Sequence, residues 1–198
     1  MLKITLATGN KHKVDEINLI AKDFNIEFVL PKGEFNPVED GSTFLENAYC
    51  KAKCASQQGD TDLYLADDSG LCVDYLDGAP GIKSARYEST PQKRIEKVLK
   101  KLENVDDINK RSAHFTCAMV VVDKNAKILF QTEKYCFGHI LKEQKGENGF
   151  GYDPIFYVDE KNCSMAQLTP DEKAHVSHRS RALNDVLKWL CANYLQEI

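Results

Sequence analysis

The chain opens with a short apolar run followed by an amphipathic segment. The run from Leu2 to Ala7 predicts a strand, whereas Val14, Ile17 and Ala21 recur at the spacing of one helix face. Asn10 stands just before this helical pattern, where its side chain can cap the first turn. The pattern therefore predicts a strand, a tight turn and a helix.

Alternating apolar and amphipathic segments continue along the chain. Thr43 and Glu46 have the spacing of a capping box, and Thr90 followed by Pro91 is a second helix start. The predicted elements are strand 26–30, a helix from residue 43, a strand from residue 63, a helix from residue 91, strands 114–122 and 127–137, strand 155–157 and a helix with apolar residues 183–195. Because helices and strands alternate early and a hairpin follows late, we expect an α/β fold with a mixed sheet. Without repeats or linker-like segments, residues 1–198 are interpreted as a single domain.

One buried strand is predicted to end in a polar group. The apolar run that begins at Leu63 leads into Asp67, Asp68, Ser69 and Gly70. Ligands of open α/β sheets bind beyond the carboxyl ends of strands, and neighbouring carboxylates suit a hard cation such as Mg²⁺. An Asp-Ser-Gly turn between two strands is the structural alternative.

Positive charge marks the start of the first predicted helix. Thr8-Gly9-Asn10 is followed by Lys11, His12 and Lys13, although the helix dipole favours acidic residues in a first turn. A bound anion would reconcile lysines with this position, because free backbone N–H groups and lysine could hold phosphate together. Solvated surface lysines explain the pattern equally well.

Three later segments are weaker candidates. Glu39 lies in the loop 31–41 before the second helix, and Lys51 lies on that helix one turn after Asn47. Further on, the Phe150-Gly151-Tyr152-Asp153 run could stack against a base or simply enter the core.

The C-terminal segment carries a further group of donors. Lys173 and the run Ser177-His178-Arg179 precede the last helix and could donate to ligand oxygens, or lie on the surface.

Composition narrows the function classes. The net charge of −4 and 42% hydrophobic content fit an ordinary globular protein and argue against a general nucleic-acid binder. With no leader-like start and no apolar run as long as a membrane span, we expect a complete cytoplasmic protein that does not contact a membrane. The seven cysteines lack zinc-site spacing and are interpreted as reduced core thiols.

Taken together and in order, these motifs resemble the Ham1-like inosine triphosphate pyrophosphatase family, the XTP/dITP diphosphatases. The matching pieces span almost the whole chain. They are Thr8 to Lys13, Glu39 to Phe44, Glu46 to Ala48, Lys51-Ala52, Ala66 to Leu71, Gly78 to Gly81, Ser84 to Tyr87, Phe150 to Pro154 and Ser177 to Arg179.

This resemblance implies a two-lobed fold, with a mixed twisted sheet flanked by helices and a central active-site cleft. It implies a homodimer that uses Mg²⁺ to hydrolyse inosine, deoxyinosine and xanthosine triphosphates to the monophosphate and pyrophosphate, which would cleanse the nucleotide pool of deaminated purines. Glu39 and Asp68 would bind the metal, with Asp68 also the water-activating base, and Glu16 is a lesser candidate for supporting the metal site. The implied substrate-binding residues are Thr8, Gly9, Asn10, Lys11, His12, Lys13, Lys51, Ser69, Phe150, Gly151, Tyr152, Asp153, Lys173, His178 and Arg179.

Within that set the resemblance assigns different roles to different residues. Thr8, Asn10 and Lys13 would hold the triphosphate, with Lys51 adding charge to it. Ser69 would touch the nucleotide, and Phe150 to Asp153 would pack around the base. Lys173, His178 and Arg179 would read the six-oxo edge of the purine. Asp67 receives no firm role beyond repelling the charge of its neighbour.

Two positions depart from the family pattern. A small residue is common at the place of His12, and threonine at that of Asp40. His12 could add a pH-dependent donor beside the phosphates, since the ordinary histidine pKa is about 6.5. An extra acid at Asp40 could perturb the metal site.

Two alternatives stay open. A Maf-like nucleotide pyrophosphatase would share the broad fold and reaction but prefer other nucleotides. A regulator that binds a nucleotide without turnover would not need the carboxylates Glu39 and Asp68.

Overall fold

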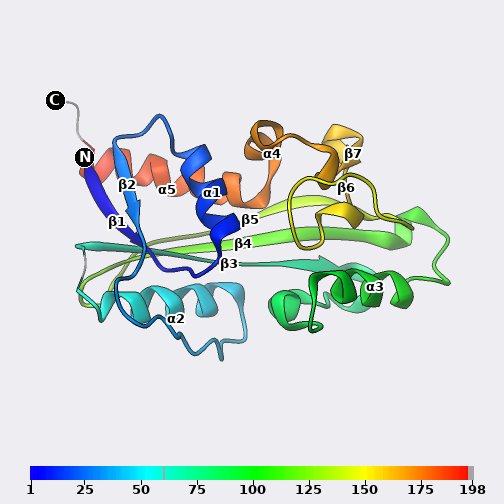
Figure 1. Cartoon of the computed structure of the whole chain (residues 1–198), viewed down its shortest axis with the longest axis horizontal. Coiled ribbons are helices and arrows are strands. Elements are labelled where there is room, and N and C mark those ends of the chain that lie inside the picture. The colour runs from blue at the N-terminus through cyan, green and yellow to red at the C-terminus, as the bar shows by residue number, and fades with distance from the viewer. Residues whose placement is uncertain (60, 196–198) are drawn as a thin grey trace. The chain divides into compact units, whose positions relative to one another are not determined.

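The protein is described by a computed structural model that covers residues 1–59 and 61–195 (Figure 1). Five α-helices are described, at Lys11–Ile20 (α1), Phe44–Ser56 (α2), Pro91–Lys101 (α3), Pro170–Val176 (α4) and His178–Tyr194 (α5). The described strands are Leu2–Leu6 (β1), Ile26–Val29 (β2), Leu63–Val73 (β3), Ser112–Asp123 (β4), Ile128–Ile140 (β5), Phe156–Val158 (β6) and Cys163–Ser164 (β7).

The strands form one mixed sheet in the order β2-β1-β3-β4-β5-β6-β7. β1 pairs in parallel with both β2 and β3, whereas β6 pairs antiparallel with β5 and β7. β4 and β5 are sheet neighbours joined by a short turn, in which the Asp123 amide donates to the Lys127 carbonyl at 3.0 Å. The predicted α/β class with a mixed sheet and a late hairpin is therefore confirmed.

Backbone contacts divide the chain into two compact units. The first draws on Met1–Asp68, Cys117–Lys134 and Arg179–Ile198, and the second on Ser69–Thr116 and Tyr135–His178. β3, β4 and β5 each contribute residues to both units. Two units agree with the predicted two lobes, whereas the central cleft and the single domain stay predictions.

In the first unit, the strands bury both faces. Alternation in β3 sends Leu63 and Leu65 to one face and Tyr64 and Ala66 to the other. The first face packs against apolar residues of α1 and α5, and the second against the alanines of α2, in agreement with the placement of these helices in Figure 1. The sheet of this unit is therefore covered by helices on both sides, which explains why its strands read as continuous apolar runs.

The second unit has its own core. Ile95 and Val98 of α3 pack with Leu71 and Val73 of β3, and with residues from β4 through α4. Arg111 is 2% exposed in this unit, and its guanidinium donates to four backbone carbonyls, those of Leu102, Val105, Ile140 and Leu141. Neutral acceptors on every side let this cation lie in an otherwise apolar region, although burial lowers its pKa.

The predicted helix starts are confirmed. Asn10 caps α1 by accepting from the His12 amide at 3.0 Å, and Thr43 and Glu46 form a complete capping box on α2. Thr90 caps α3, with Pro91 in its first turn. All seven cysteines are free thiols, but only Cys72, Cys117 and Cys136 are buried, so the description as core thiols holds for these three alone.

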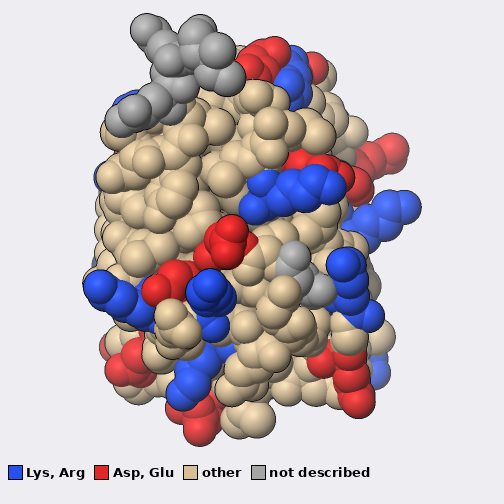
Figure 2. All heavy atoms as spheres, turned by 90° about the vertical axis from the view of Figure 1, so that its left-hand side faces the viewer, with Lys and Arg blue, Asp and Glu red and all other residues tan. Residues whose placement is uncertain are grey.

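Figure 2 shows one face of the molecule, on which acidic and basic side chains lie interspersed among uncharged ones. Within the described residues, none of the helices combines the length and apolar character needed to span a bilayer.

Candidate active site

The segment between β1 and α1 presents polar groups at a helix N-terminus. Thr8 is buried, and its hydroxyl accepts from the Asn10 amide at 3.1 Å, while Lys11 and His12 are exposed and Lys13 is half-buried. The first turn of α1 contains no acidic residue. The positive helix end and the two lysines together suit an anion such as phosphate.

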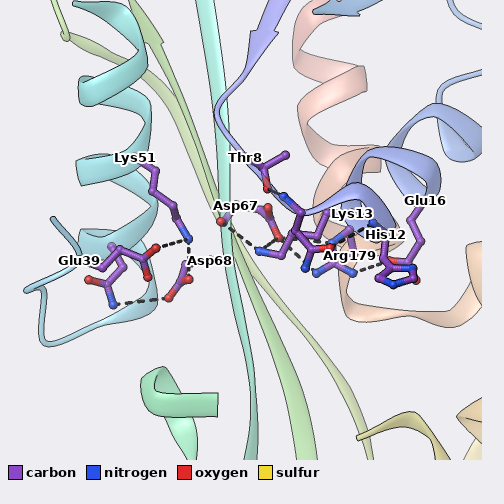
Figure 3. Close-up of polar contacts among 11 residues, drawn as sticks. Thr8, His12, Lys13, Glu16, Glu39, Lys51, Asp67, Asp68 and Arg179 are labelled. Carbon is purple, nitrogen blue, oxygen red and sulfur yellow. Dashed lines mark hydrogen bonds and ion pairs between the residues drawn. The ribbon is translucent and has the colours of Figure 1, made fainter. Parts of the chain in front are cut away.

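The prediction that the buried strand ends in a polar group at Asp67 to Gly70 is wrong, and so is the alternative of a turn there, because β3 continues through these residues to Val73. The apolar residues that follow extend the strand, and nearby cations offset the two buried carboxylates, so the chain has no need to turn toward water. The consequence is geometric. Successive strand residues point to opposite faces, so Asp67 points toward α1 and Asp68 toward α2 (Figure 3).

On the α1 face, four charged side chains form a continuous network. Asp67 lies 2.9 Å from the Lys13 ammonium and accepts from Nε and Nη2 of Arg179 at 3.3 Å each. Arg179 also donates through Nη1 to Glu16. Two carboxylates and two cations therefore balance each other at this face.

This network sets the protonation of its members. Burial acts to raise the pKa of Asp67, but the nearby charges of Lys13, Arg179 and Lys51 outweigh it and hold that pKa well below the ordinary range. Burial acts to lower the pKa of Arg179, and Asp67 and Glu16 more than offset it, so its pKa is raised. Both groups are charged across the physiological range.

On the α2 face, one ammonium serves two carboxylates. The Lys51 ammonium lies 2.7 Å from Asp68 and 3.8 Å from Glu39, and Asn47 donates to the other Asp68 oxygen at 3.5 Å. Asn47 also accepts from the Gly41 amide at 2.9 Å, which fixes the end of the loop that carries Glu39. A Cβ on Gly41 would lie 2.7 Å from Glu46, so the close approach of this loop to α2 requires glycine.

Two carboxylates, Glu39 and Asp68, share the Lys51 ammonium at this face. Burial raises the pKa of Asp68 above that of an ordinary aspartate, while Lys51 acts in the opposite direction. A carboxylate with a raised pKa accepts a proton more readily, as a general base must.

Glu39 and Asp68 fit a divalent metal on the chemistry of their donors. Their oxygens come from different elements, a loop and β3, and converge on one cation, the Lys51 ammonium. The described residues contain no cluster of three or more His, Cys, Asp or Glu side chains that could hold a metal. Two carboxylates leave most of a Mg²⁺ shell to water and to oxygens of a bound phosphate, the usual arrangement for this ion.

The predicted base-contacting residues form a separate ion-pair system in the second unit. Asp153 is buried; it lies 2.6 Å from the Lys173 ammonium and accepts from the Phe150 amide at 2.8 Å. The same ammonium lies 4.7 Å from the centre of the Phe150 ring. Gly149 has φ of +75°, and a Cβ there would lie 2.1 Å from Asp153.

Two further rings of this unit are fixed by packing. The Tyr152 hydroxyl donates to the Ser84 carbonyl at 3.0 Å, and burial raises its pKa. His178 is buried and stacks on Phe115, with ring centres 4.8 Å apart. Ser69 is half-buried in β3.

The structure thus gathers the predicted residues into three groups. Lys13, Glu16 and Arg179 meet at Asp67, Lys51 and Glu39 meet at Asp68, and Phe150, Asp153 and Lys173 meet in the second unit. Arg179, predicted to read the base, is paired with Asp67 and Glu16, whereas Lys173, which was predicted to share that role, is paired with Asp153. Its role in base recognition stays a prediction.

The central position of Asp67 is absent from the predicted site. A prediction that the strand continues through Asp67 would have revealed this position, because Leu63, Leu65 and Asp67 share one face of β3. No sequence pattern predicts that Ser84 contacts Tyr152 or that Phe115 contacts His178. The two residues of each pair are more than 60 positions apart in the chain.

This arrangement is that of an α/β protein with lysines at a helix N-terminus and two carboxylates that converge on one ammonium. The sequence profile of the Ham1 family matches residues 4–189. The chain is 44% identical over 197 residues to a dITP/XTP pyrophosphatase of Oceanobacillus iheyensis, covering 96% of this chain and 98% of the relative. It is 45% identical over 203 residues to a dITP/XTP pyrophosphatase of Vibrio parahaemolyticus, covering 99% and 100%.

Solved structures agree. A HAM1 protein from Coxiella burnetii superposes with a TM-score of 0.85 at 40% identity, covering 97% of this chain and 100% of that one. The Ham1 protein of Staphylococcus aureus gives a TM-score of 0.81 at 36% identity, covering 96% and 98%. The chain belongs to the Ham1 family.

Proposed function

We propose that this protein hydrolyses deaminated purine nucleoside triphosphates, namely dITP, XTP and ITP, to the monophosphate and pyrophosphate. The observation that carries the proposal is the pair of carboxylates, Glu39 and Asp68, converging on one cation beside lysines suited to phosphate. The names of the relatives above, dITP/XTP pyrophosphatases, support the same substrate class.

The phosphates would be held at the α1 N-terminus. Backbone N–H groups after Asn10, with Lys11 and Lys13, offer positive charge to the triphosphate, and Lys51 adds a further cation from α2. Holding the chain of phosphates at both places would orient the bond between the α- and β-phosphates, which is the bond that hydrolysis breaks.

Asp68 is the proposed general base. Its raised pKa and its position on β3 suit removal of a proton from the water that attacks the phosphorus. The oxygen of that water forms the new bond to the α-phosphate, and the pyrophosphate leaves with the electrons of the broken bond. A Mg²⁺ ion held by Glu39 and Asp68 would supply positive charge to the phosphate oxygens.

Lys173, His178 and Arg179 are the proposed readers of the six-oxo edge. Donors that bond a carbonyl at purine position six would be left without an acceptor when adenine presents its amino group. Such a mismatch can cost orders of magnitude in rate. The family resemblance further supports a homodimer. We also propose that the protein lies in the cytoplasm and has neither nucleic acid nor a membrane as partner.

A pyrophosphate-release screen across nucleoside triphosphates, with and without Mg²⁺, tests the proposal. We expect release from dITP, XTP and ITP, little from ATP, and none when the metal is chelated. Preferred turnover of uridine or thymidine triphosphate would favour a Maf-like enzyme. Binding of ITP without release of pyrophosphate would favour a regulator.

A further inference from the structure

Lys51 directs its ammonium at the two carboxylates that are proposed to bind the metal, Glu39 and Asp68. Its ammonium is 2.7 Å from Asp68 and 3.8 Å from Glu39, and the lysine is only 6% exposed. The same lysine is expected to bind phosphate when a nucleotide is present. Lys51 can therefore pair either with the two carboxylates or with the phosphates of a nucleotide.

Lys51 and a divalent ion would compete for the same two carboxylates, Glu39 and Asp68. With Lys51 in place, its positive charge lies beside both carboxylates and would repel a divalent ion brought to them. If Lys51 moved to a phosphate, the two carboxylates would lose the ammonium that they share in the structure. Binding of the nucleotide would then increase the attraction of this face for a divalent cation.

We propose that Lys51 acts as an internal substitute for the metal, which weakens metal binding until a nucleotide draws its ammonium away. In this arrangement the protein does not hold the divalent ion tightly by itself. Metal and triphosphate bind cooperatively, through a positioning residue that both require. The inference rests on the proposed function, because it takes the metal and the phosphates from it.

The α1 face of β3 provides a matched control. Lys13 is also paired with a buried aspartate of β3, but Asp67 additionally has Arg179. Replacing either lysine by methionine changes the net charge by the same amount. Only the change at Lys51 removes the cation that lies between Glu39 and Asp68.

The test is Mn²⁺ binding to the nucleotide-free protein, measured by the electron paramagnetic resonance signal of the free ion. An opposite charge within about 4 Å shifts the proton affinity of a carboxylate by roughly one to three pKa units, so Mn²⁺ affinity should respond by at least about tenfold. We expect Lys51→Met to bind Mn²⁺ at least about tenfold more tightly than the unaltered chain. Lys51→Arg should bind as weakly as the unaltered chain, and Lys13→Met should change the affinity by less than about threefold.

Two further variants test whether the gain in Mn²⁺ affinity requires Glu39 and whether it depends on methionine at position 51. The double variant Lys51→Met/Glu39→Gln should lose the gain, because it removes one of the two carboxylates. Lys51→Gln, which keeps a donor for Asp68, is measured beside Lys51→Met in case the methionine variant does not fold.

Equal Mn²⁺ affinity in the unaltered chain and the folded Lys51 variants would overturn the inference. So would an equal gain in Lys13→Met. The proposed function fails separately, if the unaltered protein releases no pyrophosphate from deaminated purine nucleotides, so the two failures are distinguishable.

Discussion

Two carboxylates that are adjacent in the sequence lie in opposite environments. Asp67 joins a balanced network with Lys13, Arg179 and Glu16, whereas Asp68 shares a single ammonium with Glu39. The pKa of Asp67 is lowered and that of Asp68 is raised. The difference shows that strand alternation alone can place two neighbouring aspartates in opposite electrostatic environments.

The largest effect is expected when Asp68 loses its charge. Asp68→Asn removes the proposed base while keeping the shape of the side chain, so kcat for pyrophosphate release from dITP should fall by roughly 10²- to 10⁴-fold. The fold should persist, as judged by an unchanged circular dichroism spectrum. Activity within a few-fold of that of the unaltered enzyme would remove Asp68 from the mechanism.

Asp67→Asn should act on stability instead. It leaves Lys13 and Arg179 without their shared buried carboxylate, and breaking such a pair costs about 3 kcal/mol or more in the free energy of unfolding. Thermal denaturation measures the loss, with Asp15→Asn, an exposed carboxylate of α1, as the control that should change little. A stability equal to that of the control would show that the α1 network contributes nothing to the fold.

The same variant carries a pH prediction. Because the pKa of Asp67 is lower in the folded chain than its unfolded value of about 3.9, its contribution is fully present above that value and is lost as the pH falls toward the folded pKa. Urea denaturation should give a constant difference between the unaltered chain and Asp67→Asn from about pH 5 to 8, shrinking below about pH 4. A difference that varies between pH 5 and 8 would contradict the assigned pKa.

Arg179 connects stability to the predicted base recognition. Arg179→Ala removes the bonds to Asp67 and Glu16, so the melting temperature should fall. If Arg179 also reads the six-oxo edge, the ratio of ITP to ATP turnover should fall by about tenfold or more. A lower melting temperature with an unchanged ratio would leave Arg179 with a purely structural role.

Local sequence signals predicted most of the fold. Capping residues such as Asn10, Thr43 and Thr90 act within one helical turn, so the pattern of neighbours suffices to place helix starts. The hairpin of β4 and β5 is similarly local. The end of β3 was not predicted, because turn-forming residues there are held in a strand by cations from α1, α2 and α5.

For the site residues too, part of the arrangement was predicted and the long-range contacts were not. Glu39 and Asp68 were predicted as a metal-binding pair from the family resemblance, and the structure brings both to Lys51, which the resemblance had placed with the triphosphate-holding residues. The link from Asp67 to Arg179 spans 112 residues, and no spacing rule within the chain reveals a contact of that range. Only the folded chain shows that Arg179 belongs beside Asp67.

The Mg²⁺ dependence of two matched variants tests the contrast between the two faces most directly. Glu39→Gln and Asp67→Asn each replace a carboxylate by its amide, one on each face of β3. The Mg²⁺ concentration for half-maximal pyrophosphate release from dITP should rise by about tenfold or more in Glu39→Gln and stay unchanged in Asp67→Asn. Equal shifts in both variants, or a shift in Asp67→Asn alone, would contradict the assignment of the metal to the Asp68 face.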